Sequence, residues 1–197
     1  RGIVQGVGFR PFVVSLAKQM SVSGFVTNTR QGLSIEAEGA PENVNKFVEQ
    51  LRERPPANSL IDRIDIREIV AIGETDFSIL QSTTKGTAPA GISPDIATCA
   101  TCLEELFDPN NRRYLYPFIT CSECGPRYSI IESPPFDRAR TSMRRFPICV
   151  ACQDEYTNVD DRRFHAQTIS CAACGPRLQL LDTEGGQLSE DINAISD

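Results

Sequence analysis

The spacing of apolar residues over the first eighty positions predicts an alternation of strands and helices. Apolar side chains recur at helical spacing within residues 11–20 and again within 41–54, so each stretch is expected to bury one face of a helix. Residues 24–29 and 33–38 alternate on either side of Arg30-Gln31-Gly32 and predict a hairpin. Residues 61–72 alternate as a further strand, and 76–80 give a short final one.

The chain begins at Arg1, so only the end of a first strand is expected before residue 5. With that strand included, the order is strand–helix–strand–strand–helix–strand. This order predicts an α+β fold of the ferredoxin-like type for residues 1–82, with its first strand truncated.

All eight cysteines lie in the second half of the chain, as four Cys-x-x-Cys pairs. Two pairs separated by eighteen residues form each half of a repeat, and the second half follows the first at an offset of fifty. A Cys-x-x-Cys turn supplies two of the four sulfurs of a tetrahedral zinc site, and a second turn supplies the others. The pattern therefore predicts two structural zinc ions, with these ligands: Cys99, Cys102, Cys121, Cys124, Cys149, Cys152, Cys171 and Cys174.

Two other interpretations of the cysteines are weaker. Disulfides are disfavoured because no signal peptide or apolar leader is seen and a Cys-x-x-Cys pair does not bridge within itself without strain. Thioredoxin-like chemistry usually needs one such pair rather than four in a repeat. A zinc ion with four thiolates has no open position, so these ions would hold structure and not catalyse hydrolysis.

The repeat extends beyond the sulfurs. Arg112-Arg113-Tyr114 corresponds to Arg162-Arg163-Phe164, and Cys-Gly-Pro-Arg occurs in both halves. The spacing leaves open whether each zinc uses one copy or the copies interleave; we expect one zinc per copy.

The change of composition divides the chain into parts. The expected divisions are a first domain over 1–82, a small polar linker over 83–97, the tandem zinc-finger domain over 98–181, and the start of a following domain over 182–197.

The formal charge of −6 disfavours nucleic-acid binding. Residues 99–177 contain ten arginines, no lysine and ten acidic residues. Arginine without lysine indicates planar, bidentate pairing within the protein or with a partner.

A glycine-rich loop precedes the first predicted helix, and its sequence is Gln5-Gly6-Val7-Gly8-Phe9-Arg10. Such a loop directs backbone N–H groups and the positive end of a helix dipole to one point, and Arg10 adds a fixed charge beside it. The sequence therefore predicts an anion site here, although a tight strand–helix connection would use the same glycines.

The run from Val4 to Arg10, followed by Gly24-Phe25-Val26-Thr27-Asn28 and Gly32, resembles the acylphosphatase signature. The resemblance implies that residues 5–10 wrap the phosphate, that Arg10 binds it and that Asn28 orients the attacking water. Arg10 and Asn28 are thus the expected catalytic pair. No nucleophile or general base is evident, so hydrolysis would depend on positioning and charge stabilisation.

An acylphosphatase-like domain before a duplicated four-cysteine module resembles the N-terminal region of the HypF family of hydrogenase maturation carbamoyltransferases. The twin Cys-Gly-Pro-Arg motifs and the run from Asp161 to Gln167 support this. The resemblance implies cleavage of carbamoyl phosphate, then ATP-dependent formation of carbamoyl adenylate in a following YrdC-like domain. It further implies carbamoyl transfer to a C-terminal cysteine of the partner HypE for nickel–iron hydrogenase, in the cytoplasm and away from membranes.

Two rival functions remain open: a non-catalytic zinc interaction module, and a free-standing acylphosphatase that contains zinc. His165 is the sole histidine, and with eight cysteines filling two sites no ligand is missing. We expect it to be a packed or surface histidine rather than a catalytic one.

Overall fold

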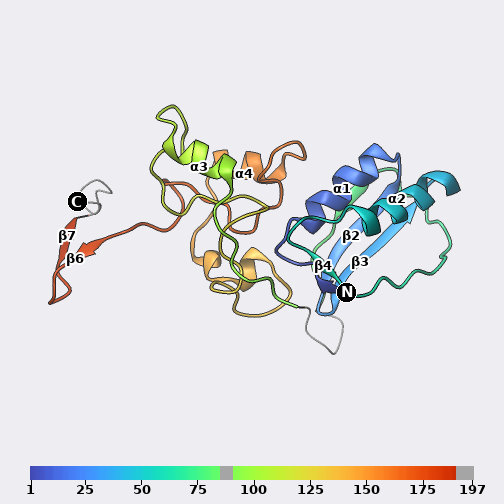
Figure 1. Ribbon diagram of the computed structural model, residues 1–197, viewed down its shortest axis with the longest axis horizontal. Coiled ribbons are helices and arrows are strands. Elements are labelled where there is room, and N and C mark those ends of the chain that lie inside the picture. The colour runs from blue at the N-terminus through green and yellow to red at the C-terminus, as the bar shows by residue number, and fades with distance from the viewer. Residues whose placement is uncertain (85–90, 190–197) are drawn as a thin grey trace.

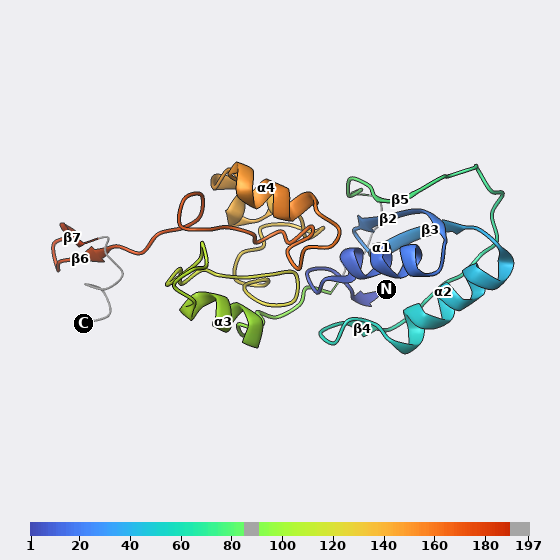
Figure 2. The ribbon, with the colours of Figure 1, turned by 90° about the horizontal axis from the view of Figure 1, so that it is seen from above.

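The computed structural model describes residues 1–84 and 91–189. These residues form two units that lie side by side, and a short hairpin projects from the far side of the second unit (Figures 1 and 2). Residues 85–90 of the predicted linker, and residues 190–197 of the expected following domain, lie outside the described residues.

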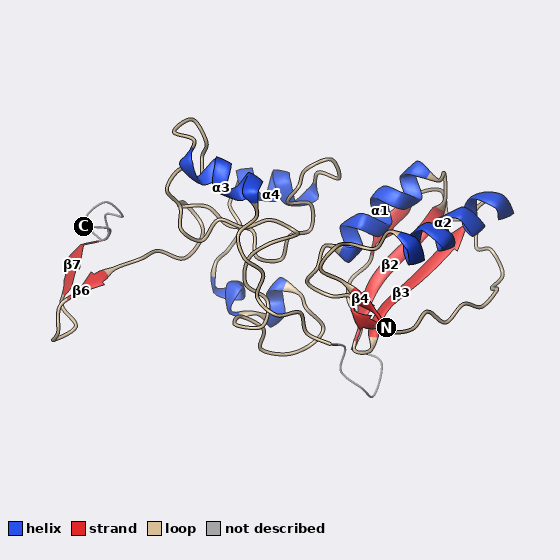
Figure 3. Cartoon of the chain, viewed as in Figure 1, coloured by secondary structure: helices blue, strands red, loops and turns tan. Residues whose placement is uncertain are grey.

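The first unit is a sheet with two helices on one face (Figure 3). Strand β2 (Ser23–Thr29) lies between β3 (Gly32–Glu38), to which it is antiparallel, and β5 (Phe77–Ile79), to which it is parallel. The covering helices are α1 (Phe9–Gln19) and α2 (Pro41–Glu53). The predicted helices and hairpin are therefore confirmed, with α1 beginning two residues earlier than expected.

The core of this unit lies between the helices and β2. Val13 and Ala17 of α1 and Val26 of β2 have no exposed surface, and Phe47 of α2 packs against Phe77 of β5 with ring centroids 6.1 Å apart. Burial of apolar surface at roughly 25 cal/mol per Å² makes this layer the main source of stability for the unit. It fixes the start of α1 beside the end of β2, where the candidate residues lie.

The prediction of a strand over residues 61–72 is wrong beyond its first residue. Only β4 (Leu60–Ile61) forms, antiparallel to β1 (Gly2–Ile3), with Gly2 opposite Ile61. The pairing ends at Arg63, whose backbone exchanges hydrogen bonds with that of Arg1, and residues 64–72 pair with no strand of the described chain. The alternating apolar side chains that suggested the strand are exposed instead: Ile64, Ile66, Ile69, Val70 and Ile72.

The second unit contains two copies of one small module, as the repeat predicts. Helix α3 (Ala100–Phe107) begins after Cys99, and α4 (Val150–Thr157) begins at the equivalent place after Cys149. Two short 3-10 helices, η1 (Arg138–Arg140) and η2 (Ser142–Arg145), lie between the copies. Beyond them, β6 (Leu180–Leu181) and β7 (Gln187–Ser189) form the projecting hairpin.

The chain stays against the first unit on both sides of residues 85–90. The Thr27 hydroxyl donates to the Gln81 carbonyl at 2.9 Å, and the Thr83 amide donates to the Asn28 carbonyl at 2.8 Å. Farther along, Ile92 forms a bridge with Gln5. These contacts hold the second unit close to the glycine-rich loop.

Candidate active site

The glycine-rich loop lies between β1 and α1 and turns sharply into the helix. Gly6 and Gly8 both have φ of 73°, a conformation that favours glycine, and Gly8 is the N-terminal cap of α1. No described residue accepts a hydrogen bond from the backbone N–H groups of residues 7–10. These donors lie at the positive end of the helix dipole, which is the arrangement expected of an anion site.

Gln5 ties this loop to the hairpin. Its side-chain amide donates to the carbonyls of Thr29 and Gly32, in each case at 2.7 Å. These bonds bring the end of β2, and Asn28 with it, beside the loop. Arg10 and Asn28 are both buried, at 9% and 1% exposure, so the structure places the two residues of the expected catalytic pair in one site.

A segment of the second unit, residues 136 and 137, completes the site. The Phe136 carbonyl accepts from Arg10 Nη2 at 3.3 Å and from Asn28 Nδ2 at 3.3 Å, while the Phe136 amide donates to Gln5 Oε1 at 2.9 Å. A carboxylate oxygen of Asp137 lies 2.9 Å from Arg10 Nη1. Sequence reasoning missed this segment because no motif marks it and more than 100 residues separate it from its partners.

Arg127, from the first Cys-Gly-Pro-Arg motif, binds the same loop from the second unit. Its Nε donates to the Gly6 carbonyl, and its guanidinium lies 5.9 Å from the centre of the Phe136 ring. Burial lowers the pKa of Arg127. A Cβ at Gly6 would lie 3.0 Å from the Arg127 Cδ, so glycine is needed for this close approach.

A cavity of about 30 Å³ remains among these groups, lined on the loop side by Gly6, Gly8 and Arg10 and bordered by Asn28 and His165. Such a volume is enough to hold a water molecule. Asn28 Oδ1 is buried and has no hydrogen-bond partner in the described part of the chain. A buried acceptor beside a water-sized space is a place where one water molecule can be held.

His165 is packed, as expected, but it also borders this site. Its ring lies 4.7 Å from that of Phe164 and 4.8 Å from that of Tyr156. Burial, and secondarily the charge of Arg10, lower its pKa to about 4, although Asp137 opposes the shift. His165 is therefore neutral at pH 7, and its place beside Arg10 was not evident from the sequence.

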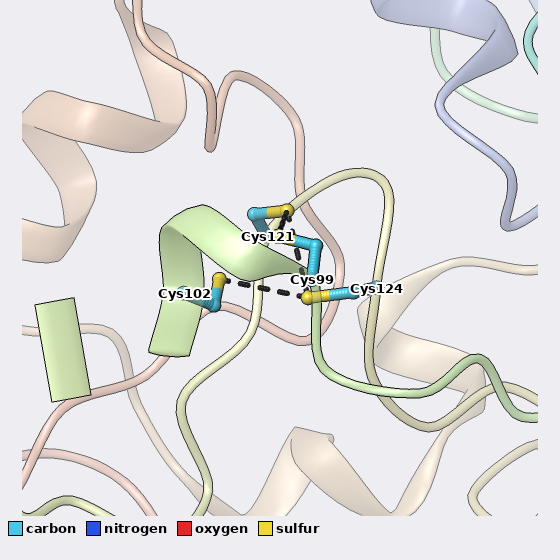
Figure 4. Close-up of side chains that lie close together, drawn as sticks. All are labelled: Cys99, Cys102, Cys121 and Cys124. Atoms are coloured by element: carbon cyan, nitrogen blue, oxygen red, sulfur yellow. Dashed lines mark hydrogen bonds between the residues drawn. The ribbon is translucent and has the colours of Figure 1, made fainter. Parts of the chain in front are cut away.

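The eight cysteines form two clusters, and each cluster uses the four cysteines of one copy. Figure 4 shows the first cluster, in which Cys99 and Cys102 at the start of α3 face Cys121 and Cys124. Neighbouring sulfurs in it are 3.5 to 3.9 Å apart, and no cysteine forms a disulfide. A tetrahedron with Zn–S bonds of about 2.3 Å has edges of about 3.8 Å, so the clusters fit a zinc ion. The expectation of one cluster per copy is confirmed.

The paired arginines of each copy cross to the cysteines of the other copy. Arg162 of the second copy lies 3.1 Å from the sulfurs of both Cys99 and Cys102 in the first. In the reverse direction, Arg112 lies 3.1 Å from Cys152 and 3.6 Å from Cys149. The negative charge of each cysteine cluster is thus neutralised in part by an arginine of the other copy.

The second arginine of each pair is buried on a carboxylate of the other copy. Arg163 pairs with Glu105 and also donates to the Thr120 carbonyl at 3.0 Å. Arg113 pairs with Glu155 in the equivalent way. Burial alone would raise the pKa of Glu105, but hydrogen bonding and charge from Arg163 and Arg162 more than offset it and lower that pKa. The arginine pairing inferred from composition is therefore internal to the protein.

Comparison with known families agrees with this division into two units. A family model described as acylphosphatase matches residues 1–79, and one described as HypF finger matches residues 98–131 and 148–181. None of the helices within residues 1–84 and 91–189 is long and apolar enough to cross a membrane.

Several known proteins are similar to this chain. Carbamoyltransferase HypF of Synechocystis sp. is 47% identical over 146 residues, covering 74% of this chain and 19% of that protein. Probable carbamoyltransferase HypF of Methanocaldococcus jannaschii is 48% identical over 144 residues, covering 70% and 18%. An acylphosphatase of Thermotoga maritima is 38% identical over 79 residues, covering 40% of this chain and 87% of the relative. The chain thus spans about a fifth of the length of the carbamoyltransferases it matches.

Solved structures give the same picture. A full-length HypF in its phosphate- and nucleotide-bound form superposes with a TM-score of 0.86 at 47% identity, covering 93% of this chain and 25% of that one. HypF of T. kodakarensis superposes with a TM-score of 0.82 at 42% identity.

The sole histidine makes the geometry of the site testable by titration. Because burial and Arg10 disfavour the imidazolium, we expect the NMR signals of His165 to titrate near pH 4, and to titrate at higher pH in Arg10→Ala. A pKa close to 6.5 in the unaltered chain would contradict the packing described.

The same shift affects stability. The unfolded chain protonates His165 below about pH 6.5, whereas the folded chain protonates it only near pH 4. The unfolding free energy is therefore unaffected by His165 protonation above pH 6.5 and decreases as the pH falls from 6.5 toward 4. His165→Gln should reduce the fall in unfolding free energy between pH 6.5 and 4, whereas an identical fall in both proteins would argue against the shift.

Proposed function

This chain belongs to the acylphosphatase family, with paired HypF fingers following the acylphosphatase unit, and we propose that the unit hydrolyses carbamoyl phosphate. The observation that carries the proposal is the meeting of Arg10 and Asn28 at the glycine-rich loop. That a similar HypF was solved with phosphate bound supports it.

In the proposed reaction, the backbone N–H groups of residues 7–10 and the Arg10 guanidinium bind the phosphoryl oxygens. Asn28 holds a water molecule, with its unpaired Oδ1 accepting one O–H. The water oxygen forms a bond to phosphorus, the bond from phosphorus to the carbamoyl oxygen breaks, and carbamate and inorganic phosphate leave. Charge stabilisation and positioning suffice because an acyl phosphate is already a reactive anhydride.

We further propose that the complete protein is a carbamoyltransferase for nickel–iron hydrogenase maturation. The similarity to carbamoyltransferases HypF supports this, and the chain would supply the first step. ATP-dependent formation of carbamoyl adenylate and transfer to HypE would require parts of the protein beyond the 197 residues of this chain. A cytoplasmic location is proposed on the same basis.

We propose that each cysteine cluster holds one structural zinc ion. All four positions of such an ion are filled by thiolates, so it fixes the fold of the module and takes no part in hydrolysis. Arg127 and Phe136 belong to the finger module, residues 98–181, and both contact the glycine-rich loop. The zinc ions would therefore also hold the side of the candidate active site that these two residues form.

The catalytic pair is tested with carbamoyl phosphate as substrate and release of inorganic phosphate as the measurement. Arg10→Ala and Asn28→Ala should each lower kcat by about 100- to 1,000-fold, the effect of losing one group that stabilises a transition state. Arg30→Ala is the matched control, since Arg30 is an exposed arginine of the hairpin turn and should change nothing. Equal activity in all variants would refute the proposed pair, and phosphate binding without turnover would favour the non-catalytic alternative.

The crossed arginines are tested through the metal rather than through activity. Arg162→Ala should weaken Co²⁺ or Zn²⁺ binding by the cluster of the first copy about 10- to 100-fold, because outer-sphere partners of metal ligands have effects of this size. Co²⁺ absorption in a chain whose second cluster is disabled by Cys171→Ser and Cys174→Ser reports the first cluster alone. Arg144→Ala is the control. If Arg162→Ala weakens metal binding no more than Arg144→Ala does, the crossed arrangement is contradicted.

A further inference from the structure

The segment of Phe136 and Asp137 contacts all three side chains that define the candidate site, namely those of Gln5, Arg10 and Asn28. We propose that this segment is an internal ligand of the phosphate loop, which an acyl phosphate must displace in order to bind. The inference rests on the proposed function, since it takes residues 5–10 as the phosphate site.

The first argument is that the segment uses the donors that the substrate and water need. The Phe136 carbonyl oxygen accepts hydrogen bonds from Arg10 Nη2 and Asn28 Nδ2, both at 3.3 Å. One oxygen atom bonded to both residues lies where a phosphoryl oxygen or a bound water would have to lie. The Phe136 amide bond to Gln5 Oε1, at 2.9 Å, fixes the carbonyl in that position.

The second argument is charge. The Asp137 carboxylate pairs with Arg10 Nη1 at 2.9 Å, and both side chains are largely buried. A dianionic phosphate on the same guanidinium would lie close to this carboxylate, and like charges at short range repel strongly in a partly buried site. Asp137 and the phosphate therefore compete for Arg10.

The third argument is space. Phe136 lines the same cavity as Gly6, Gly8 and Arg10, so the segment borders the space that an acyl phosphate would enter. An acyl phosphate that bonds to Arg10 and to the loop therefore meets the Phe136 carbonyl and the Asp137 carboxylate on the same guanidinium.

The segment is anchored in the second unit, so its displacement is passed on to that unit. Arg138, the next residue, donates to the carbonyls of Gln167 and Ile169 at 3.0 and 2.8 Å and to that of Phe146 at 2.7 Å. When phosphate replaces the segment, the finger module loses its bonds to Arg10, Asn28 and Gln5 together. Occupancy of the phosphate loop therefore alters this part of the contact between the units and leaves the bond from Arg127 to Gly6 in place.

The test is the affinity of the zinc-loaded chain for inorganic phosphate, measured by isothermal titration calorimetry. Asp137→Ala removes the competing charge and should lower the phosphate Kd about tenfold, the effect of one charge-assisted bond. Asp137→Asn keeps the shape without the charge and should give an intermediate Kd; it also serves if the alanine variant is unstable. Asp160→Ala is the matched control, since Asp160 is an exposed finger-module carboxylate that faces Lys18 of the first unit at 3.8 Å.

The outcomes separate this inference from the proposed function. Loss of phosphate binding in Arg10→Ala supports the phosphate site itself, whatever Asp137 does, and undiminished binding refutes that site. Given a phosphate site, tighter binding in Asp137→Ala supports the internal ligand. An unchanged or higher Kd in both Asp137 variants overturns it, because Asp137 would then hold Arg10 in its binding position rather than compete for it.

Discussion

The bonds between the Phe136–Asp137 segment and the glycine-rich loop are the constraint on which the arrangement of the two units depends. They join the start of α1, the end of β2 and the finger module at one point. Without the segment, the buried Asn28 Nδ2 would have no acceptor and Arg10 would keep only the Ser82 hydroxyl, which is costly. The finger module supplies these acceptors, so the site is shared by both units rather than belonging to the first alone.

The finger module can form one side of the candidate active site because the charges of its own residues are balanced within the module. Each cysteine cluster receives an arginine from the other copy, and each of those arginine pairs shares one glutamate. The copies therefore depend on each other for neutralisation, which ties the geometry of one cluster to that of the next. Arg127, three residues after Cys124, then connects the first cluster to Gly6 of the loop.

Local patterns in the sequence were enough for the hairpin around Arg30, both helices of the first unit and the two cysteine clusters, because each depends on residues close together or on strict spacing. Strand β4 could not be predicted correctly from its alternation, since a strand also needs a partner and residues 64–72 pair with no strand of the described chain. The roles of Phe136, Asp137 and His165 come from contacts between residues distant in the sequence. The repeat offered a signal only for Arg127, through its Cys-Gly-Pro-Arg motif.

The most direct test of this account is hydrogen exchange at the Phe136 backbone amide, which donates to Gln5 Oε1 across the two units. In the zinc-loaded chain without phosphate, this amide should be strongly protected. Saturating inorganic phosphate should remove that protection while amides in the interior of α1 stay protected, because the segment leaves and the first unit remains folded. Equal protection of the Phe136 amide with and without bound phosphate would contradict the account.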